Sequence, residues 1–186
     1  MIRTERYRLR RTVVMVGMMG SGKTAVGRAL ALRLGVPFLD SDAAIEEAAR
    51  ATIAEIFAQD GERFFRRRET EVIDRLLSGP PCILSTGGGA FLAERNRMAI
   101  AQKGVALRLD APLALLWERV RNKDTRPLLQ TADPLATLTD LYAARDPVYA
   151  LAELSLPVNA ASSIEDTADR VIALLKTRPD ILETLP

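Results

Sequence analysis

The stretch Gly17-Met18-Met19-Gly20-Ser21-Gly22-Lys23-Thr24 decides the fold of this chain. It fits the phosphate-binding P-loop pattern G-x-x-x-x-G-K-[ST], in which backbone N–H groups surround a phosphate and the lysine reaches the β- and γ-phosphates. Residues 13–16 form an apolar, β-branched run typical of a buried strand, and residues 25–34 have helical periodicity. This order favours a nucleoside triphosphate site over a glycine-rich turn without a ligand.

The composition describes an ordinary globular domain and excludes several kinds of site. The 186 residues suffice for one domain, and hydrophobic residues make up 48% and charged residues 27% of them. The chain has no histidine, which excludes histidine bases and Ser-His-Asp triads. Cys82 is the single cysteine and lies in an apolar run, so we expect a core residue and a reducing, cytoplasmic location. No apolar stretch is long enough to predict a membrane span.

Strand and helix signals alternate along the rest of the chain, which predicts an α/β fold with a parallel sheet covered on both faces. We expect four further strands at residues 36–39, 82–84, 105–109 and 154–158. We expect helices at residues 52–57, 62–77, 93–102, 113–121, 135–151 (interrupted near Pro147) and 164–175, with a break at Asp60-Gly61. Residues 1–11 read as a solvated basic extension, residues 12–176 as one domain, and residues 177–186 as a frayed tail.

Polar residues follow the expected strands, where a parallel sheet binds ligands. Asp40 and Asp42 are two residues apart, so in an extended backbone both carboxylates face the same region beside the P-loop. One could hold Mg²⁺ through water, together with the Thr24 hydroxyl, while the other orients an attacking hydroxyl. The alternative is a capping pair, with Asp42 as the N-cap of the next helix. The glycine triplet 87–89 allows the backbone to approach a ligand closely, or is only a flexible turn.

Most of the positive charge is on arginine, which binds carboxylates and phosphates through two parallel hydrogen bonds. Arg66, Arg67 and Arg68 follow one another near the start of a charged helix, which usually indicates a solvated face, although one of them could point inward. Arg126 lies in a polar, aperiodic segment, residues 122–134, that suits a lid closing on phosphates. Arg145 is unremarkable on its own.

Taken together and in order, these motifs resemble the shikimate kinase family. They are the P-loop, Leu39-Asp40-Ser41-Asp42, Gly61-Glu62-x-x-Phe65-Arg66-x-x-Glu69, Ser85-x-Gly87-Gly88-Gly89 and Arg126-Pro127-Leu128-Leu129. The resemblance covers roughly residues 12–176. It implies a P-loop NTPase fold like that of the nucleoside monophosphate kinases, three layers (α/β/α) around a five-stranded parallel sheet of order 2-3-1-4-5. It also implies a substrate-binding region at about 41–70 and a lid at about 122–134.

The resemblance further implies transfer of the ATP γ-phosphate to the 3-hydroxyl of shikimate, with Mg²⁺, on the route to the aromatic amino acids. The implied catalytic residues are Lys23, Asp42 and Arg126. The expected nucleotide contacts are Gly20, Ser21, Gly22, Lys23, Thr24, Ala25, Arg119 and Arg126. The expected shikimate contacts are Asp42, Arg66, Gly88, Gly89 and Arg145, with Glu69 supporting the substrate arginine. Thr24 and, through water, Asp40 are the expected metal ligands. The chain departs from the family pattern at Val158-Asn159-Ala160, where aspartate is more usual than Asn159.

Two other functions remain open at this point. A gluconate-type sugar-acid kinase shares the P-loop and an acidic substrate, but should lack the ordered Asp, Gly-Glu and Gly-Gly-Gly motifs. A P-loop switch coupled to nucleic acid would account for the five arginines within residues 1–11. The net charge of +2 is too small to support a nucleic-acid partner. We therefore expect shikimate as the partner molecule, no nucleic-acid or membrane partner, and a monomer.

Overall fold

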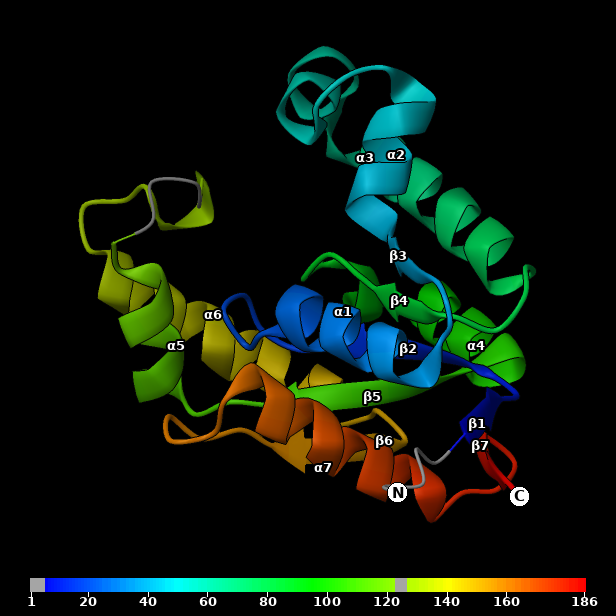
Figure 1. Cartoon of the computed structure of the whole chain (residues 1–186). Helices are drawn as coiled ribbons and strands as arrows, with labels where there is room; N and C mark the ends of the chain where they lie inside the picture. The colour runs from blue at the N-terminus through cyan, green and yellow to red at the C-terminus, as the bar shows by residue number, and fades with distance from the viewer. Residues whose placement is uncertain (1–5, 123–126) are drawn as a thin grey trace.

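The computed structural model describes residues 6–122 and 127–186 of the chain (Figure 1). Its strands are β1 (Arg6–Leu9), β2 (Thr12–Val16), β3 (Phe38–Asp40), β4 (Ile83–Ser85), β5 (Gly104–Asp110), β6 (Leu154–Pro157) and β7 (Leu182–Leu185). Its α-helices are α1 (Lys23–Leu34), α2 (Ser41–Ala49), α3 (Ile53–Leu77), α4 (Glu94–Lys103), α5 (Leu113–Val120), α6 (Pro134–Tyr149) and α7 (Ile164–Lys176). Two short 3₁₀ helices are η1 (Ala90–Leu92) and η2 (Pro127–Leu129).

The central sheet has five parallel strands in the order β3-β4-β2-β5-β6. The five strands expected from the sequence are β2 to β6, so this order is the predicted 2-3-1-4-5. The strand before the P-loop, β2, lies in the middle, with Val13 paired to Ile83 on one side and to Val105 on the other. Every residue of β2 is buried, which explains why it reads as a continuous apolar run.

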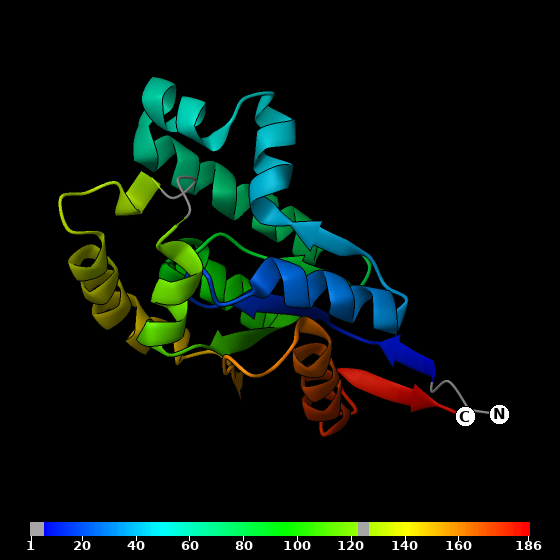
Figure 2. The same ribbon diagram turned by 60° about the vertical axis from the view of Figure 1, so that its left-hand side comes forward.

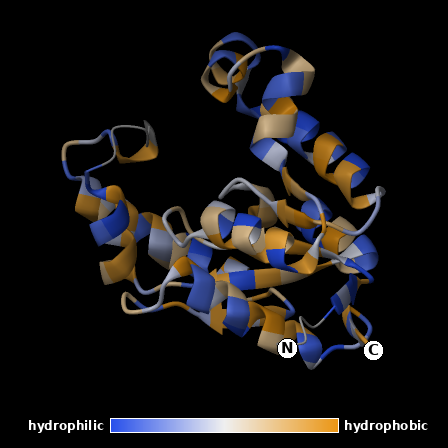
Figure 3. Ribbon diagram, viewed as in Figure 1, coloured by the Kyte–Doolittle hydropathy of each residue, from blue (hydrophilic) through white to orange (hydrophobic). Residues whose placement is uncertain are grey.

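Helices cover both faces of this sheet, as alternating strands and helices require. In Figure 1, α1 and α7 lie on the near face, whereas α4 lies on the far face. Hydrophobic residues line the strands and the helix sides that meet them, and hydrophilic residues face outward (Figure 3). The three-layer α/β/α arrangement expected from the sequence is therefore confirmed. No helix among the described residues is long and apolar enough to cross a membrane.

The two ends of the described chain form an additional sheet, which the sequence did not predict. Strands β1 and β7 pair antiparallel and lie side by side in Figures 1 and 2. Leu182 is 1% exposed, and Glu183 pairs with Arg10 at 2.8 Å. The expectation of a frayed C-terminal tail is therefore wrong, as is that of a solvated arm for residues 6–9. The pairing joins segments more than 170 residues apart, which no local pattern signals.

The helical region beside the sheet has a small hydrophobic core of its own. Ile45, Ile56, Phe65 and Val72 form this second cluster between α2 and α3. Helix α3 is interrupted at Gly61, whose φ of 80° and ψ of 171° are not helical, so the predicted break at this glycine is confirmed. Helix α6, in contrast, continues through Pro147 to Tyr149, and the predicted interruption there is wrong.

Candidate functional site

A cleft of about 650 Å³ opens at the carboxyl ends of the central strands. It is bordered by the P-loop, by the segment that joins β3 to α2, and by the glycines after β4. Helix α5 and the start of α7 complete its walls. Five separate parts of the chain thus meet at the cleft and bring together most of the residues that the sequence predicted to act together. The lining residues include Gly20, Ser21, Gly22, Lys23, Thr24, Ala25, Asp40, Asp42, Gly87, Gly88 and Arg119.

The P-loop adopts a backbone that only glycine accommodates readily. Gly20 and Gly22 have φ values of 79° and 99°, and a Cβ at Gly20 would lie 2.8 Å from Val120 Cγ1. Gly22 precedes α1 without a side-chain cap, so the first N–H groups of this helix have no capping side chain. A helix start of this kind attracts anions, because its N–H groups and its dipole both favour negative charge.

Lys23 and Ser21 occupy the floor of the P-loop. Lys23 Nζ donates hydrogen bonds to the carbonyl oxygens of Gly17 at 2.8 Å and Met18 at 2.9 Å, which hold the ammonium group over the loop. Ser21 Oγ is buried and has no hydrogen-bond partner among the described residues. A buried hydroxyl without a partner is costly, so this atom is suited to a ligand atom. Thr24 and Ala25, in contrast, are exposed at the cleft wall.

Asp40 and Asp42 lie together at the cleft, but not for the reason expected. The strand ends at Asp40, and Asp42 belongs to the first turn of α2, so the two are not in one extended segment. Asp40 is the N-cap: its Oδ1 accepts hydrogen bonds from the N–H groups of Asp42 at 2.9 Å and Ala43 at 3.2 Å. The interpretation of Asp42 as the N-cap is therefore wrong, and its carboxylate is available for another role.

The environment of Asp42 differs from that of a surface carboxylate. The pKa of Asp42 is raised from 3.8 to about 6, mainly by burial and further by the charges of Asp40 and Glu69, while Lys23 opposes this increase. Asp42 Oδ1 is buried and has no hydrogen-bond partner among the described residues. A Cβ at Gly87 would lie 2.6 Å from this oxygen, so only glycine leaves room beside it. The carboxylate is therefore poised near neutral pH with one oxygen open to a ligand.

Of the three consecutive arginines, Arg66 is the one that points inward. Its Nη1 donates to Glu69 Oε2 at 2.9 Å, and the Glu69 side chain is only 1% exposed. Burial lowers the pKa of Arg66, but Glu69 and Glu62 outweigh this and leave it above its ordinary value. A Cβ at Gly89 would lie 2.6 Å from Arg66 Nη2. Arg67 and Arg68 instead stack on Phe64 at the surface.

Arg145 reaches the same glycine triplet from α6. Its Nη1 lies 3.7 Å from the position that a Cβ at Gly88 would take. The three glycines thus face Asp42, Arg145 and Arg66 in turn, so the structure brings the expected substrate residues together. Tyr149 and Arg108 are two neighbours that the sequence analysis missed: the Tyr149 hydroxyl donates to the Gly88 carbonyl, and Arg108 Nη2 pairs with Asp146, next to Arg145, at 2.5 Å.

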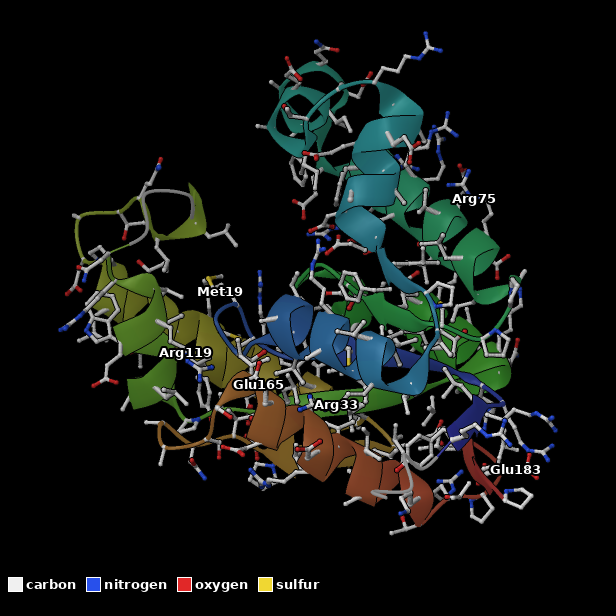
Figure 4. The ribbon with its side chains drawn as sticks, viewed as in Figure 1. Met19, Arg33, Arg75, Arg119, Glu165 and Glu183 are labelled. Atoms are coloured by element: carbon white, nitrogen blue, oxygen red, sulfur yellow. The ribbon has the colours of Figure 1, made fainter. Side chains whose placement is uncertain are left out.

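The far end of the cleft is formed by α5 and the start of α7. Arg119 Nη1 donates to the Gly20 carbonyl at 3.1 Å, and Figure 4 shows this side chain reaching from α5 toward the P-loop. Ser163 caps α7 and lines the cleft together with Thr167, two polar residues not predicted from the sequence. Asn159 Oδ1 accepts from the Ser162 N–H and hydroxyl, both at 2.9 Å, so the amide closes the turn as an aspartate would.

The described residues do not include the expected lid arginine, and they form no acidic cluster that could hold the expected Mg²⁺. Arg126, with the central part of the expected lid, lies outside the described residues. No group of three or more acidic, cysteine or histidine side chains suited to a metal occurs in the described ranges. Any Mg²⁺ here would therefore take most of its ligands from phosphate oxygens and water, as is usual for Mg²⁺ at nucleotide sites.

Comparison with known proteins gives a consistent result. The shikimate kinase family model matches residues 19–176. A shikimate kinase of Ruegeria pomeroyi is 66% identical over 94% of this chain and 90% of its own length, and one of Cereibacter sphaeroides is 61% identical over 95% and 88%. The structure of a shikimate kinase from Acinetobacter baumannii in complex with shikimate is 40% identical, covers 90% of this chain and 93% of its own, and has a TM-score of 0.84.

Proposed function

The chain belongs to the shikimate kinase family of ATP-dependent kinases, and from this premise we propose that it transfers the γ-phosphate of ATP to the 3-hydroxyl of shikimate through the residues described below. The observation that supports this most directly is the open carboxylate oxygen of Asp42. It lies at the cleft shared with the P-loop, beside a glycine that leaves room for a ligand. A sugar-like hydroxyl is a suitable partner for a buried acceptor of this kind.

Asp42 is the group that orients and deprotonates the acceptor hydroxyl. A general base works best with a pKa near the operating pH, and burial raises the pKa of Asp42 to about 6. The carboxylate is therefore ionised at neutral pH and still basic enough to accept the hydroxyl proton as the bond to phosphorus forms. Lys23 is close enough to lower the pKa of Asp42, which indicates that the base and the P-loop lysine act in one site.

Arg66 and Arg145 form the clamp for the substrate carboxylate. They come from α3 and α6 and approach the glycine triplet at Gly89 and Gly88. Two guanidinium groups that converge on open backbone suit a planar carboxylate, which arginine binds through paired hydrogen bonds. Glu69 fixes the orientation of Arg66 through their 2.9 Å hydrogen bond. The glycine N–H groups supply further donors to the substrate hydroxyls.

The P-loop binds and activates the phosphates of ATP. The uncapped N–H groups at the start of α1, residues 23–25, and the Lys23 ammonium neutralise charge that develops on the transferred group, which is the main contribution a protein makes to this chemistry. Arg119 lies at the end of the cleft formed by α5 and α7 and contacts the P-loop at Gly20, so the nucleotide base would extend past it toward α7. Arg126 is assigned to the phosphates on the resemblance alone, as the residue of the lid at about 122–134.

Mg²⁺ fits the residues beside the P-loop. When bound, it would neutralise negative charge on the ATP phosphates. The exposed Thr24 hydroxyl would hold it directly. Asp40 would hold it through water, since one Asp40 oxygen already caps α2. We also propose a monomer in the cytoplasm with neither nucleic-acid nor membrane partners. The buried, single Cys82 is in keeping with a reducing compartment.

A coupled assay of ADP release tests the function. Purified full-length chain should release ADP from MgATP only when shikimate is present, and a single phosphoryl group should appear on the 3-hydroxyl by ³¹P and ¹H NMR. Turnover with gluconate instead would assign a sugar-acid kinase. Release stimulated by RNA or DNA and indifferent to shikimate would assign a nucleic-acid-coupled switch.

The clamp is tested by Arg66→Lys and Arg145→Lys, which keep the charge and remove the paired hydrogen bonds. Each substitution should weaken shikimate binding by ~1–3 kcal/mol, the scale of a charge-assisted hydrogen bond. The affinity for ATP should change much less. Arg67→Lys is a matched control, since Arg67 lies on the outer surface of the same helix. Equal losses for ATP and shikimate in the two clamp variants would show a general structural defect and move the clamp elsewhere.

A further inference from the structure

We propose that Tyr149 is a positioning residue, which couples the clamp arginine Arg145 to the Gly88 peptide through its hydroxyl group. The inference rests on the proposed function, because it concerns the same substrate site. Tyr149 is the last residue of α6 and is 1% exposed, yet its hydroxyl lies at the inner edge of the site. It donates a hydrogen bond to the Gly88 carbonyl oxygen.

The same hydroxyl is also the neighbour of Arg145. Arg145 Nη1 and Tyr149 Oη each lie 3.7 Å from the position of a Cβ at Gly88. The Arg145 guanidinium is close enough to the phenol to lower its pKa, against the larger opposite effect of burial. In the proposed coupling, Arg145 donates to the phenol oxygen while the phenol donates to the Gly88 carbonyl. A phenol can do this because its oxygen accepts and donates at the same time.

Helix geometry explains why these two side chains meet. Tyr149 follows Arg145 by four residues, so both lie on one face of α6, about one turn apart. Arg145 is partly exposed and carries a long, flexible side chain, whereas the Tyr149 ring is buried and held by packing on all sides. The rigid side chain thus restricts the mobile one, which lowers the entropy that Arg145 loses when it binds a carboxylate.

The protonation state of Tyr149 supports a donor role. Burial raises its pKa above 10, and the nearby cations Arg145 and Arg66 lower it only in part. The hydroxyl therefore keeps its proton at neutral pH and donates it to the Gly88 carbonyl. Packing alone would be served equally well by phenylalanine, whereas a buried hydroxyl is costly unless both of its roles are satisfied.

Removal of the hydroxyl tests this coupling with little change of shape. In the full-length chain, Tyr149→Phe should raise the KM for shikimate about tenfold, which corresponds to one hydrogen bond of ~1.4 kcal/mol. The KM for ATP should stay within twofold of the original. Tyr142→Phe, which removes a hydroxyl from the same helix, is the matched control and should leave both constants unchanged. A purely structural role for Tyr149 would instead lower Tm and alter both constants together.

A double-mutant cycle separates positioning from an independent contact. If Tyr149 acts through Arg145, the variant with both Tyr149→Phe and Arg145→Lys should bind shikimate within twofold of Arg145→Lys alone. Additive losses, an unchanged KM for shikimate in Tyr149→Phe, or equal losses for ATP would each overturn the proposal. Should Tyr149→Phe melt near the assay temperature, calorimetric titration of shikimate at 10 °C replaces the kinetic measurement.

ADP release by the unsubstituted chain distinguishes failure of the proposed function from failure of the positioning role of Tyr149. Absence of shikimate-dependent ADP release from that chain would refute the proposed function itself. Normal release, with Tyr149→Phe indistinguishable from it, would refute only the positioning role and leave the function intact.

Discussion

Replacement of Asp42 by asparagine should inactivate the protein and stabilise its fold, two effects of opposite sign. Burial raises the pKa of Asp42 from 3.8 to about 6, so the folded state holds the proton more tightly than the unfolded chain. The ionised carboxylate therefore destabilises the fold at neutral pH. At ~1.36 kcal/mol per pH unit, this difference amounts to roughly 3 kcal/mol, an upper value because the group is partly exposed.

The sign of the pH dependence follows from the same linkage. The destabilisation is fully present above pH 6, decreases as the pH falls through 6, and is gone below about 4. The asparagine side chain carries no charge at any pH, so Asp42→Asn should unfold in more urea than the original chain at pH 7.5. Linkage predicts that roughly half of this gain remains at pH 5 and that little remains at pH 4.

Asp42→Asn should lower the activity although it raises the stability. Asparagine keeps the shape of the side chain but cannot accept the proton, and a general base commonly contributes 10²- to 10⁴-fold. The kcat/KM of the original chain should also fall below about pH 6 as Asp42 becomes protonated. Asp140→Asn, at an exposed position of α6, is the control for removal of one negative charge. An Asp42→Asn variant that is less stable at pH 7.5 and retains most of its kcat would refute this reasoning, because it would make Asp42 a structural residue.

Three further substitutions probe other parts of the structure. Lys23→Ala should lower kcat by ~10²- to 10³-fold with an unchanged circular dichroism spectrum, since Lys23 neutralises developing phosphate charge; near-normal turnover would contradict the P-loop assignment. Gly89→Ala should raise the KM for shikimate about tenfold, because the added Cβ displaces the flexible end of Arg66. The tenfold loss of affinity corresponds to ~1.4 kcal/mol, and Tm should change little. An unchanged KM would place Arg66 outside the substrate site. Leu182→Ala should cost ~2–4 kcal/mol in urea unfolding, because this side chain is 1% exposed; a cost under ~0.5 kcal/mol would show that β7 adds nothing to the fold.

The parallel sheet and the P-loop could be predicted because their signals are local. A strand buried on both faces reads as an apolar run, and the glycines of the P-loop have fixed spacing. The inward orientation of Arg66 had a local signal as well, since the buried Glu69 lies three residues further on the same helix face. Arg68 has the same spacing, with Glu71 three residues further on, so the signal becomes decisive only with the burial of Glu69, which depends on tertiary packing.

The remaining features depend on tertiary contacts or on the position of a single boundary. Whether Asp40 or Asp42 caps α2 depends on where β3 ends, and element boundaries are the least certain part of a sequence pattern. The β1–β7 pair joins two short segments at opposite ends of the chain. Tyr149 carried a weak signal, its four-residue spacing from Arg145, but its hydrogen bond to Gly88 depends on how α6 packs against a distant loop.

The separate core of α2 and α3 has a consequence for how the molecule opens. Helix α3 contributes Ile56, before the kink at Gly61, and Phe65 and Val72, after it, to the small cluster, whereas its end belongs to the main core with Ile73 and Leu77. Local unfolding of the small cluster can therefore expose its amides to solvent while the sheet stays intact. We expect amide hydrogen exchange in α2 and the first half of α3 to be much faster than in β2. Shikimate should slow exchange there selectively, because Arg66 joins this region to the glycine loop.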